Sequence, residues 1–255
     1  MWRRIRIIVL LFILAFVALN TWFDRLYSTD WDIPLRVAVY PINGDGGEET
    51  ERFIAQRSFD DHSALERFFS EQAAQYALNL DTPVTFASAQ PLRDAPPALE
   101  PGSNPLQIAW WSLRTRLWAW RAPQAGPAPD VKLFVLYHDP QRTSVLPHSI
   151  GLQKGLFAIV HAFADRSMLG SNDVVIAHEL LHTLGATDKY DLGTNQPLHP
   201  EGFAEPGLDP LYPQNSAELM GGRIPLSPSQ SETPESLNEA VIGPATAHEI
   251  GWRSR

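Results

Sequence analysis

The sequence predicts an α/β fold of the α+β kind, with a twisted mixed sheet and helices in its N-terminal half. Three observations lead to this prediction. Short apolar runs rich in β-branched residues alternate with segments of helical spacing up to about residue 165. A helix-forming segment that carries two histidines follows. Residues 191–244 are rich in Pro, Gly, Ser and Asn and show little periodicity, so the C-terminal half is predicted to be mostly irregular.

The individual elements follow from local composition and spacing. Strands are expected over 35–42, 83–89, 131–139, 144–153 and 155–165, and helices over 60–80, 106–120 and 244–252. The run 131–139 is almost continuously apolar, which is typical of a central strand. The four tryptophans of the helix 106–120 are expected to lie in the core; they are Trp110, Trp111, Trp118 and Trp120.

Charge and cysteine content exclude several kinds of protein. The 255 residues carry a formal net charge of −9, and phosphate binding needs basic patches, so nucleic acid is not expected as a partner. The chain has no cysteine, which excludes disulfides, cysteine-ligated zinc and a thiol nucleophile. The loop 43–49 leaves calcium possible but not supported, because its acids do not have the spacing of a twelve-residue calcium loop.

The N-terminus has the pattern of a membrane-directed segment. Three arginines at positions 3, 4 and 6 precede an unbroken apolar run of 13 residues, Ile7 to Leu19. Residues 1–23 are therefore predicted to be a membrane anchor or signal sequence, with 24–34 as a linker and 35–255 as one domain. Because arginines stay on the cytoplasmic side, a single-pass protein with an extracytoplasmic domain is expected, or a secreted one if the segment is cleaved.

The stretch AHELLHTLGATDKYD, residues 177–191, has the spacing of a zinc site. His178 and His182 are four residues apart, so on a helix they share a face and can supply two corners of a zinc tetrahedron. Glu179 is rotated away by about 100° and can reach a water that the metal activates. The alternative is an ordinary helix with two satisfied histidines, since the five-residue pattern occurs by chance in about one chain in a hundred. Gly185 is well placed to end the helix.

His178-Glu179-x-x-His182-x-x-Gly185-x-x-Asp188 resembles the long zinc signature of the metzincin clan of metallopeptidases. More narrowly, it is similar to the aspartate-ending version of snapalysin and of immune-inhibitor-A-type peptidases. The resemblance covers eleven contiguous residues and one turn. It implies a zincin fold, one catalytic Zn²⁺ and hydrolysis of peptide bonds.

The resemblance also implies roles for individual residues. The ligands would be His178, His182 and Asp188, with Glu179 as general base. Met220, in the stretch AELMGG, would be the methionine of the Met-turn beneath the metal.

The sequence departs from the family pattern after the Met-turn. Many metzincins have a tyrosine two residues after the turn methionine, where this chain has Gly222. A tyrosine that assists the transition state would have to come from elsewhere, and the candidates are Tyr190 and Tyr212.

The leading interpretation is thus a membrane-anchored, extracytoplasmic zinc endopeptidase that acts on a peptide or protein. An extended substrate is expected to pair with the strand edge formed by 144–153, and residues 191–236 to shape the pocket for the residue after the cut. One alternative is a catalytically inactive zincin-fold binding module of the cell envelope. Another is a thermolysin-like peptidase with Glu201 or Glu205 as third ligand. The pair His248-Glu249 is not expected to bind metal, because Trp252 stands where a second histidine would be needed.

Overall fold

The computed structural model describes residues 30–56, 62–100, 102–123, 127–153 and 155–252. The predicted anchor or signal sequence, residues 1–23, lies outside this part of the chain, as does most of the linker 24–34. The predicted single-pass membrane localisation is contradicted, because none of the helices in the described residues has the length and hydropathy needed to cross a membrane. A bilayer crossing needs about 20 apolar residues. The longest described helix has 17 residues and contains three arginines.

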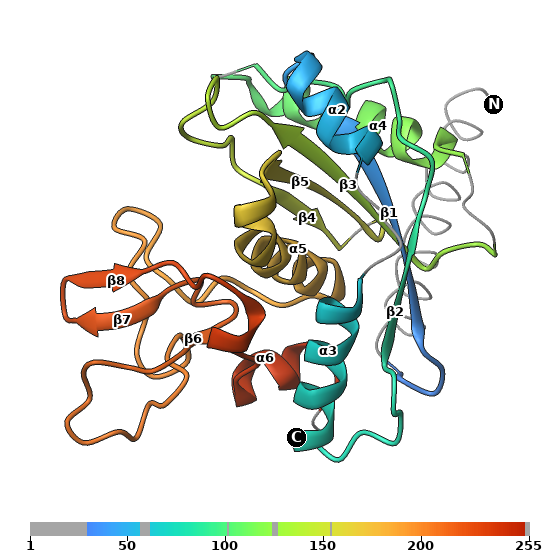
Figure 1. Ribbon diagram of the computed structural model, residues 1–255. Coiled ribbons are helices and arrows are strands. Elements are labelled where there is room, and N and C mark those ends of the chain that lie inside the picture. Colours follow the sequence, from blue (N-terminus) through green and yellow to red (C-terminus); the bar gives the residue numbers. More distant parts are fainter. Residues whose placement is uncertain (1–29, 57–61, 101, 124–126, 154, 253–255) are drawn as a thin grey trace, which may run out of the picture.

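A five-stranded mixed sheet forms the centre of the molecule (Figure 1). Its strands are β1 (Leu35–Asn43), β2 (Val84–Ser88), β3 (Val131–His138), β4 (Ile150–Leu152) and β5 (Phe157–Phe163), in the spatial order β2-β1-β3-β5-β4. The first four in that order are parallel and β4 is antiparallel to β5. The mixed α/β class and the central position of β3 are confirmed. The last predicted pair of strands is shorter than expected, and 144–149 contains no strand.

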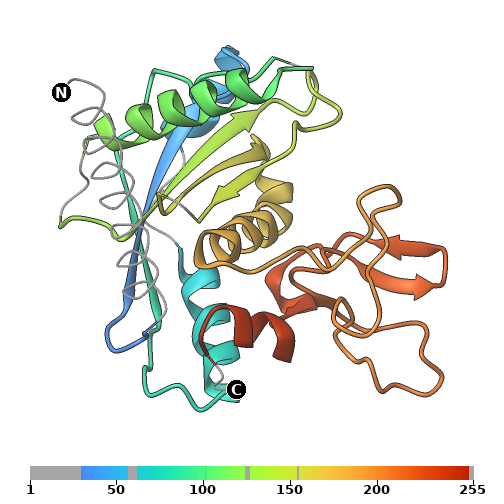
Figure 2. The same ribbon diagram turned by 180° about the vertical axis from the view of Figure 1, so that it is seen from behind.

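Five α-helices are present among the described residues: α2 (Glu48–Gln56), α3 (Ser63–Gln75), α4 (Pro105–Arg121), α5 (Leu169–Leu184) and α6 (Pro244–Glu249). Helix α2 was not predicted, because its segment is short and follows a glycine-rich loop. Figures 1 and 2 show α4 on one face of the sheet and α5 on the other. The alternation along β3 explains this arrangement: Leu133 and Val135 belong to the core cluster beneath α3 and α5, and Phe134 belongs to the cluster beneath α4.

The tryptophans of α4 do not all lie in the core. The Trp118 ring packs against Phe134 with ring centroids 4.4 Å apart, and Trp111 donates a hydrogen bond to the carbonyl of Pro97. Trp110 and Trp120, in contrast, are 61% and 77% exposed. The prediction of four core tryptophans is therefore wrong for two of them, because hydrophobicity alone does not tell which face of an apolar helix is covered.

The loop after β1 is organised by one carboxylate. Asp45 accepts hydrogen bonds from the backbone N–H of Gly47 and of Asp139 and from the Thr50 hydroxyl. These bonds hold the pKa of Asp45 below its usual value, although burial acts in the opposite direction. The carboxylate ties the end of β1 to the end of β3, which is a structural role.

Beyond α5, the C-terminal segment (residues 185–252) contains only short pieces of regular structure. Strands β6 (Ala217–Glu218) and β9 (Ala240–Val241) pair in parallel, and β7 (Ile224–Ser227) and β8 (Gln230–Glu232) form a hairpin. A 3₁₀ turn lies at Leu237–Glu239. A second 3₁₀ turn, Arg166–Met168, precedes α5 and is not part of this segment. The segment lies beside α5 and ends with α6, as Figure 1 shows. The predicted irregular half and its closing helix are thus present.

Candidate metal centre

Helix α5 starts earlier than its sequence suggests. Ser171, Asn172 and Asp173 are candidate N-caps, but the helix begins at Leu169, directly after a 3₁₀ turn. Asn172 instead exchanges two hydrogen bonds with the backbone of Phe163, its amide oxygen accepting at 3.0 Å and its amide nitrogen donating at 2.9 Å. This contact fixes α5 to the end of β5 and sets the position of the histidines two turns later.

The end of α5 is the predicted one. Gly185 has a φ of +102°, in the left-handed region that favours glycine, and its N–H bonds the carbonyls of Leu181 and His182. The N–H of Ala186 also bonds the Leu181 carbonyl, at 3.0 Å. The chain therefore reverses directly after the second histidine, which brings residues 186–190 back beside α5.

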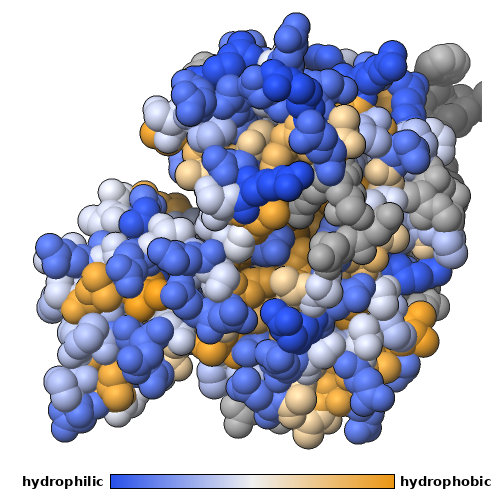
Figure 3. Space-filling model, in the orientation of Figure 1, coloured by the Kyte–Doolittle hydropathy of each residue, from blue (hydrophilic) through white to orange (hydrophobic). Residues whose placement is uncertain are grey.

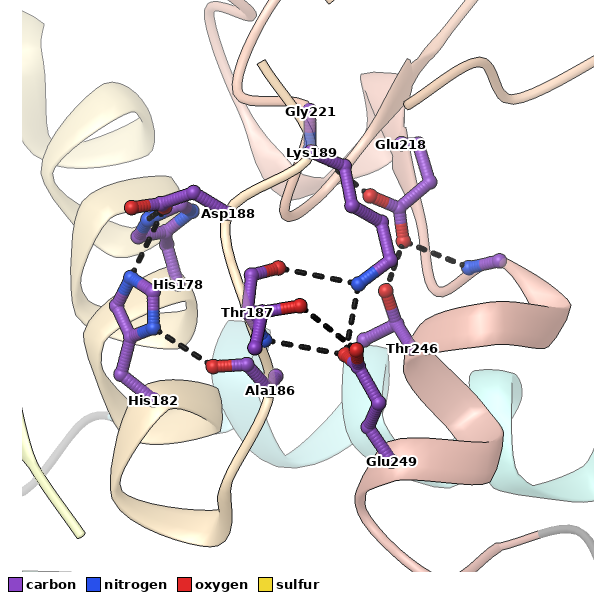
Figure 4. Close-up of polar contacts among 11 residues, drawn as sticks. His178, His182, Ala186, Thr187, Asp188, Lys189, Glu218, Gly221, Thr246 and Glu249 are labelled. Atoms are coloured by element: carbon purple, nitrogen blue, oxygen red, sulfur yellow. Dashed lines mark hydrogen bonds and ion pairs between the residues drawn. The ribbon is translucent and has the colours of Figure 1, made fainter. Parts of the chain in front are cut away.

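The two histidines point their Nε2 atoms at one oxygen. The Nδ1 atom of His178 lies 2.9 Å from the carbonyl oxygen of Leu219, and Nδ1 of His182 lies 2.9 Å from the carbonyl oxygen of Ala186. The Nε2 atoms lie 3.3 Å (His178) and 3.1 Å (His182) from Oδ1 of Asp188. Figure 4 shows the three side chains converging.

This arrangement leaves neither Nε2 atom with a hydrogen to donate to Asp188. A carbonyl oxygen only accepts, so each Nδ1 must carry the proton of its ring. A neutral imidazole then has only a lone pair at Nε2, and this lone pair faces a carboxylate oxygen. Two lone pairs facing one carboxylate oxygen repel it, and a cation among the three atoms would remove this repulsion. Carbonyl partners at Nδ1 are the usual second shell of metal-binding histidines.

The spacing and the donor types both fit zinc. Two ligands at about 2.0–2.1 Å from a tetrahedral zinc stand about 3.3 Å apart. The two Nε2–Oδ1 distances, 3.3 and 3.1 Å, match this separation. Two imidazole nitrogens and one carboxylate oxygen are a donor set that zinc accepts, with a fourth position left for a reacting molecule.

Glu179 lies on the same helix, beside the two histidines. Its side chain is 6% exposed, and His178, Glu179 and His182 offer ligand atoms within 4.8 Å of one another. Oxygen Oε2 is buried and accepts no hydrogen bond from the described residues. Burial raises the pKa of Glu179, although the two histidines favour its charged form. The carboxylate also accepts a backbone hydrogen bond from Gly151, so it is held beside the three converging atoms.

Strand β4 is the edge strand next to this cluster, on the side where a substrate edge was predicted. Its Gly151 lies so close to α5 that an added Cβ would be 2.4 Å from Cβ of His182 and 2.7 Å from the Glu179 carbonyl. Only glycine fits there. The edge strand and the histidine helix are thereby held in direct contact.

Asp188 and Tyr190 come from the reversed loop after α5. Burial would raise the pKa of Asp188, but its contacts with His178 and His182 outweigh burial and lower that pKa far below its usual range. The Tyr190 hydroxyl bonds to Asp188, and its ring centroid is 6.4 Å from that of His178. Burial and the nearby carboxylates Asp188 and Glu179 raise the pKa of Tyr190 to about 12. The phenol therefore stays protonated at neutral pH.

The other predicted candidates lie elsewhere. Tyr212 packs against Phe203, with ring centroids 5.7 Å apart. Glu205 accepts hydrogen bonds from the backbone and the side chain of Asn215, and Glu201 is exposed. In the part of the chain that the structure describes, neither glutamate belongs to a group of three possible metal ligands.

Met220 is fully buried in a turn that directly supports the cluster. Its carbonyl accepts the backbone N–H of Lys189 at 2.9 Å, and the preceding residue, Leu219, supplies the carbonyl that bonds His178. Gly221 is packed so closely that an added Cβ would be 2.3 Å from the carbonyl oxygen of Gly202. The turn thus joins α5, the loop of Asp188 and the 198–203 loop.

A network of buried charges supports the metal centre, and sequence reasoning missed it (Figure 4). Lys189, 3% exposed, donates to the Thr187 carbonyl at 3.0 Å and to Glu249 at 2.7 Å. Glu218, fully buried, accepts from the N–H of Gly221, from the N–H of a second glycine, Gly243, and from the Thr246 hydroxyl.

The network links three parts of the C-terminal segment: the loop 187–189, the turn 218–221 and helix α6. Burial raises the pKa of Glu218, although its hydrogen bonds act in the opposite direction. Glu249 also accepts from the N–H and the hydroxyl of Thr187. From the sequence, the His248-Glu249 pair is not expected to bind metal. In the structure Glu249 lies in α6 and binds Thr187 and Lys189, the residues on either side of Asp188. It thus holds this loop against α6. The only indication of this network in the sequence was Lys189, directly after the expected ligand Asp188.

A pocket of about 290 Å³ opens beside His178. Apolar atoms of Val174, Val175 and Leu219 form much of its wall. The lining also includes five polar residues from other loops and turns: His148, Tyr190, Asn195, Arg223 and Thr233. The space-filling view shows the surface notched between the C-terminal segment and the sheet (Figure 3). The predicted contribution of residues 191–236 to a pocket is thus seen at Asn195 and at 219–223.

No family model matches this sequence, and none of the curated proteins is significantly similar to it. The fold and the site together define a mixed α/β protein with a His-Glu-His cluster and an aspartate that contacts both histidines.

Proposed function

We propose that this protein is a zinc-dependent endopeptidase of the metzincin type, with His178, His182 and Asp188 as the zinc ligands. The observation that carries the proposal is the convergence of two imidazole Nε2 atoms on Oδ1 of Asp188 at 3.1 and 3.3 Å, with both Nδ1 atoms already bonded to carbonyls. This donor set is the one that a single zinc ion would complete.

In this proposal the chain's own residues move the proton and hold the substrate. When bound, zinc supplies Lewis acidity, which polarises the scissile carbonyl and lowers the pKa of the attacking water. Glu179 takes the proton from that water and delivers it to the departing amine, a role that suits its buried, unpaired Oε2. Tyr190 stays protonated and donates a hydrogen bond to the oxygen on which negative charge develops.

The substrate would lie along β4. The strand is at the sheet edge and Gly151 contacts α5, so an extended peptide paired with β4 would pass beside Glu179. The residue after the cut would enter the pocket beside His178. The apolar part of that pocket's wall favours a medium-sized apolar side chain there.

Two alternatives have less support. A binding module without activity needs no unpaired carboxylate next to the converging donors. A thermolysin-like arrangement needs Glu201 or Glu205 at the metal, and Glu205 is bonded to Asn215 instead.

Glu179→Ala tests the proposal. Purified wild type and variant are assayed for bound zinc and for cleavage of an unfolded protein, with Glu201→Ala as the matched control. We expect one zinc per chain in all three proteins, and cleavage reduced about 10²- to 10⁴-fold in Glu179→Ala alone. Wild-type activity in Glu179→Ala, or no zinc in the wild-type protein, would overturn the proposal.

A further inference from the structure

Helix α4 exposes a continuous apolar stripe on the face that points away from the sheet. Five residues form this α4 stripe, and their exposed fractions are high: Leu106 82%, Trp110 61%, Leu113 57%, Leu117 44% and Trp120 77%. Their spacing alternates between four and three residues, as in the a and d positions of a coiled coil. At 100° per residue, all five lie within about 40° of one line along the helix.

The stripe lies on the side of α4 away from the contacts that join this helix to the sheet. The buried residues of the helix, Thr115 and Ala119, lie on the opposite side, together with Trp118, which contacts Phe134. Figure 2 shows α4, in green, crossing the outer face of the sheet. Contiguous apolar surface of this kind on a folded protein marks a site of interaction.

Positive charge borders the stripe on both sides. Arg114 and Arg121 lie about 60–80° to one side of it and Arg116 about 80° to the other, at 100° per residue. Helix α4 contains no Asp, Glu or Lys, although the protein as a whole carries −9. A groove of about 540 Å³ beside Leu117 is lined by Arg93, Arg114 and Arg121 and by one acid, Asp94, so its charge is positive on balance.

These arginines are available for a partner. None of the four forms a salt bridge with a carboxylate of the described residues. In the heptad that places Trp110 at a and Leu113 at d, Arg114 and Arg121 occupy e positions and Arg116 a g position. Charges at e and g choose the partner helix in coiled coils.

We propose that the α4 stripe docks an acidic amphipathic helix of a partner protein, with leucine-type residues against the stripe and glutamates against Arg114, Arg116 and Arg121. A second copy of this chain fits less well, because pairing two α4 helices would bring arginines together. A lipid surface fits less well too, because the apolar arc is only about 80° wide and such helices present a broader face.

Two synthetic 21-residue peptides provide the test on the full chain. Both have leucine at a and d; one has glutamate at every e and g position, the other lysine. We expect the glutamate peptide to bind at least tenfold more tightly, measured by the change in tryptophan fluorescence and by calorimetry. Equal affinity for the two peptides, or none for either, would overturn the proposal.

Variants locate the interaction. Arg114→Glu/Arg116→Glu/Arg121→Glu should reverse the preference, so that the lysine peptide binds more tightly. Trp110→Ala/Leu113→Ala should weaken binding at least tenfold, whereas Ile33→Ala, which changes an equally exposed apolar residue before β1, should not. Far-UV circular dichroism checks that each variant is folded.

Two further outcomes would replace the proposal. Vesicles of anionic phospholipid that bind wild type, but not Trp110→Ala/Leu113→Ala, more tightly than the glutamate peptide does would assign the stripe to a lipid surface. A dimer of the wild-type chain that the same double variant dissolves would assign it to a second copy.

Discussion

The sheet half of the molecule and the C-terminal segment are stabilised in different ways. In the sheet, β3 and its neighbours are almost entirely buried and apolar, and the strands are seven to nine residues long in β1, β3 and β5. In the C-terminal segment no strand exceeds four residues, and two charged side chains, Lys189 and Glu218, are almost fully buried. One half is held by apolar packing, and the other depends on hydrogen bonds to buried charges.

The candidate metal centre lies where these two halves meet. Helix α5 is packed on the sheet and supplies the histidines. The C-terminal segment supplies Asp188, Tyr190 and the carbonyl of Leu219. Residues on regular elements can be placed by periodicity, whereas Asp188, the proposed third ligand, lies on a loop held by buried charges. Changes in the two halves should therefore affect the protein differently.

The largest expected effect is on metal affinity. Asp188→Ala removes one of three protein ligands. Zinc binding energies of about 10–16 kcal/mol are shared among four ligands, so we expect a loss of about 3–4 kcal/mol, on the order of a thousandfold in affinity. Titration with a chelator measures it, and Glu201→Ala should behave like wild type. If Glu201→Ala released zinc and Asp188→Ala did not, the glutamate-ligand alternative would replace the metzincin type.

The next effect is on the stability of the C-terminal segment. Lys189→Met keeps the length of a side chain that is 3% exposed but removes its bonds to Glu249 and Thr187. Because Glu249 keeps partial access to water, we expect a loss of about 2 kcal/mol rather than the larger cost of a fully buried unpaired charge. Urea unfolding measures this loss.

The matched control comes from the sheet half. Arg36 and Asp130 also form an ion pair, with N–O distance 3.0 Å, but their side chains are 48% and 32% exposed. Arg36→Ala should hardly change the unfolding midpoint, because exposed pairs contribute little. Equal losses in Arg36→Ala and Lys189→Met would contradict the contrast drawn between the two halves.

The same contrast explains what the sequence could predict. The apolar run of β3, the helical spacing of α4 and the His-x-x-x-His interval of α5 are local patterns, and each led to the correct element. Helix α2 was missed because nine residues after a glycine-rich loop carry little periodicity. The exposed side of α4 was not predictable either, because both of its faces are apolar.

In the C-terminal segment local patterns are missing. Lys189 and Glu249 are 60 residues apart and Glu218 and Thr246 are 28 apart, so neither contact leaves a local signal. The proposed ligands could be predicted only because Gly185 and Asp188 stand at a fixed short distance from the helix. The part of the site built by long-range polar contacts had no such spacing.

A third prediction separates the two tyrosines. Tyr190→Phe removes a hydroxyl that is bonded to Asp188 and stays protonated at neutral pH. We expect kcat to fall about tenfold, equivalent to about 1.4 kcal/mol, with unchanged zinc content. Tyr212→Phe, whose ring packs on Phe203 away from the histidines, should have wild-type kcat. A fall in kcat for Tyr212→Phe alone would assign the role to the other tyrosine.

The smallest expected effect is a pH dependence that belongs to the C-terminal segment. Burial alone would raise the pKa of Glu249, but its bonds to Lys189 and Thr187 outweigh burial and lower that pKa below its ordinary value of 4.5. An acid whose pKa is lower in the folded state adds stability above its unfolded pKa and loses it as the pH falls. Wild type should therefore lose this contribution below about pH 4.5.

Lys189→Met removes the strongest cause of that lowered pKa, so it should lose less stability between pH 7 and pH 3 than wild type does. Because Glu249 is partly exposed, we expect a difference under about 1 kcal/mol. Urea unfolding of both proteins at the two pH values measures it. Lys189 also favours the charged form of Glu218, so Glu218 changes the comparison in the same direction, whereas carboxylates distant from Lys189 titrate alike in both proteins and cancel. A difference between wild type and variant that stays constant, or grows, toward pH 3 would mean that Lys189 acts through packing and not through its charge, and the segment would then resemble the sheet half after all.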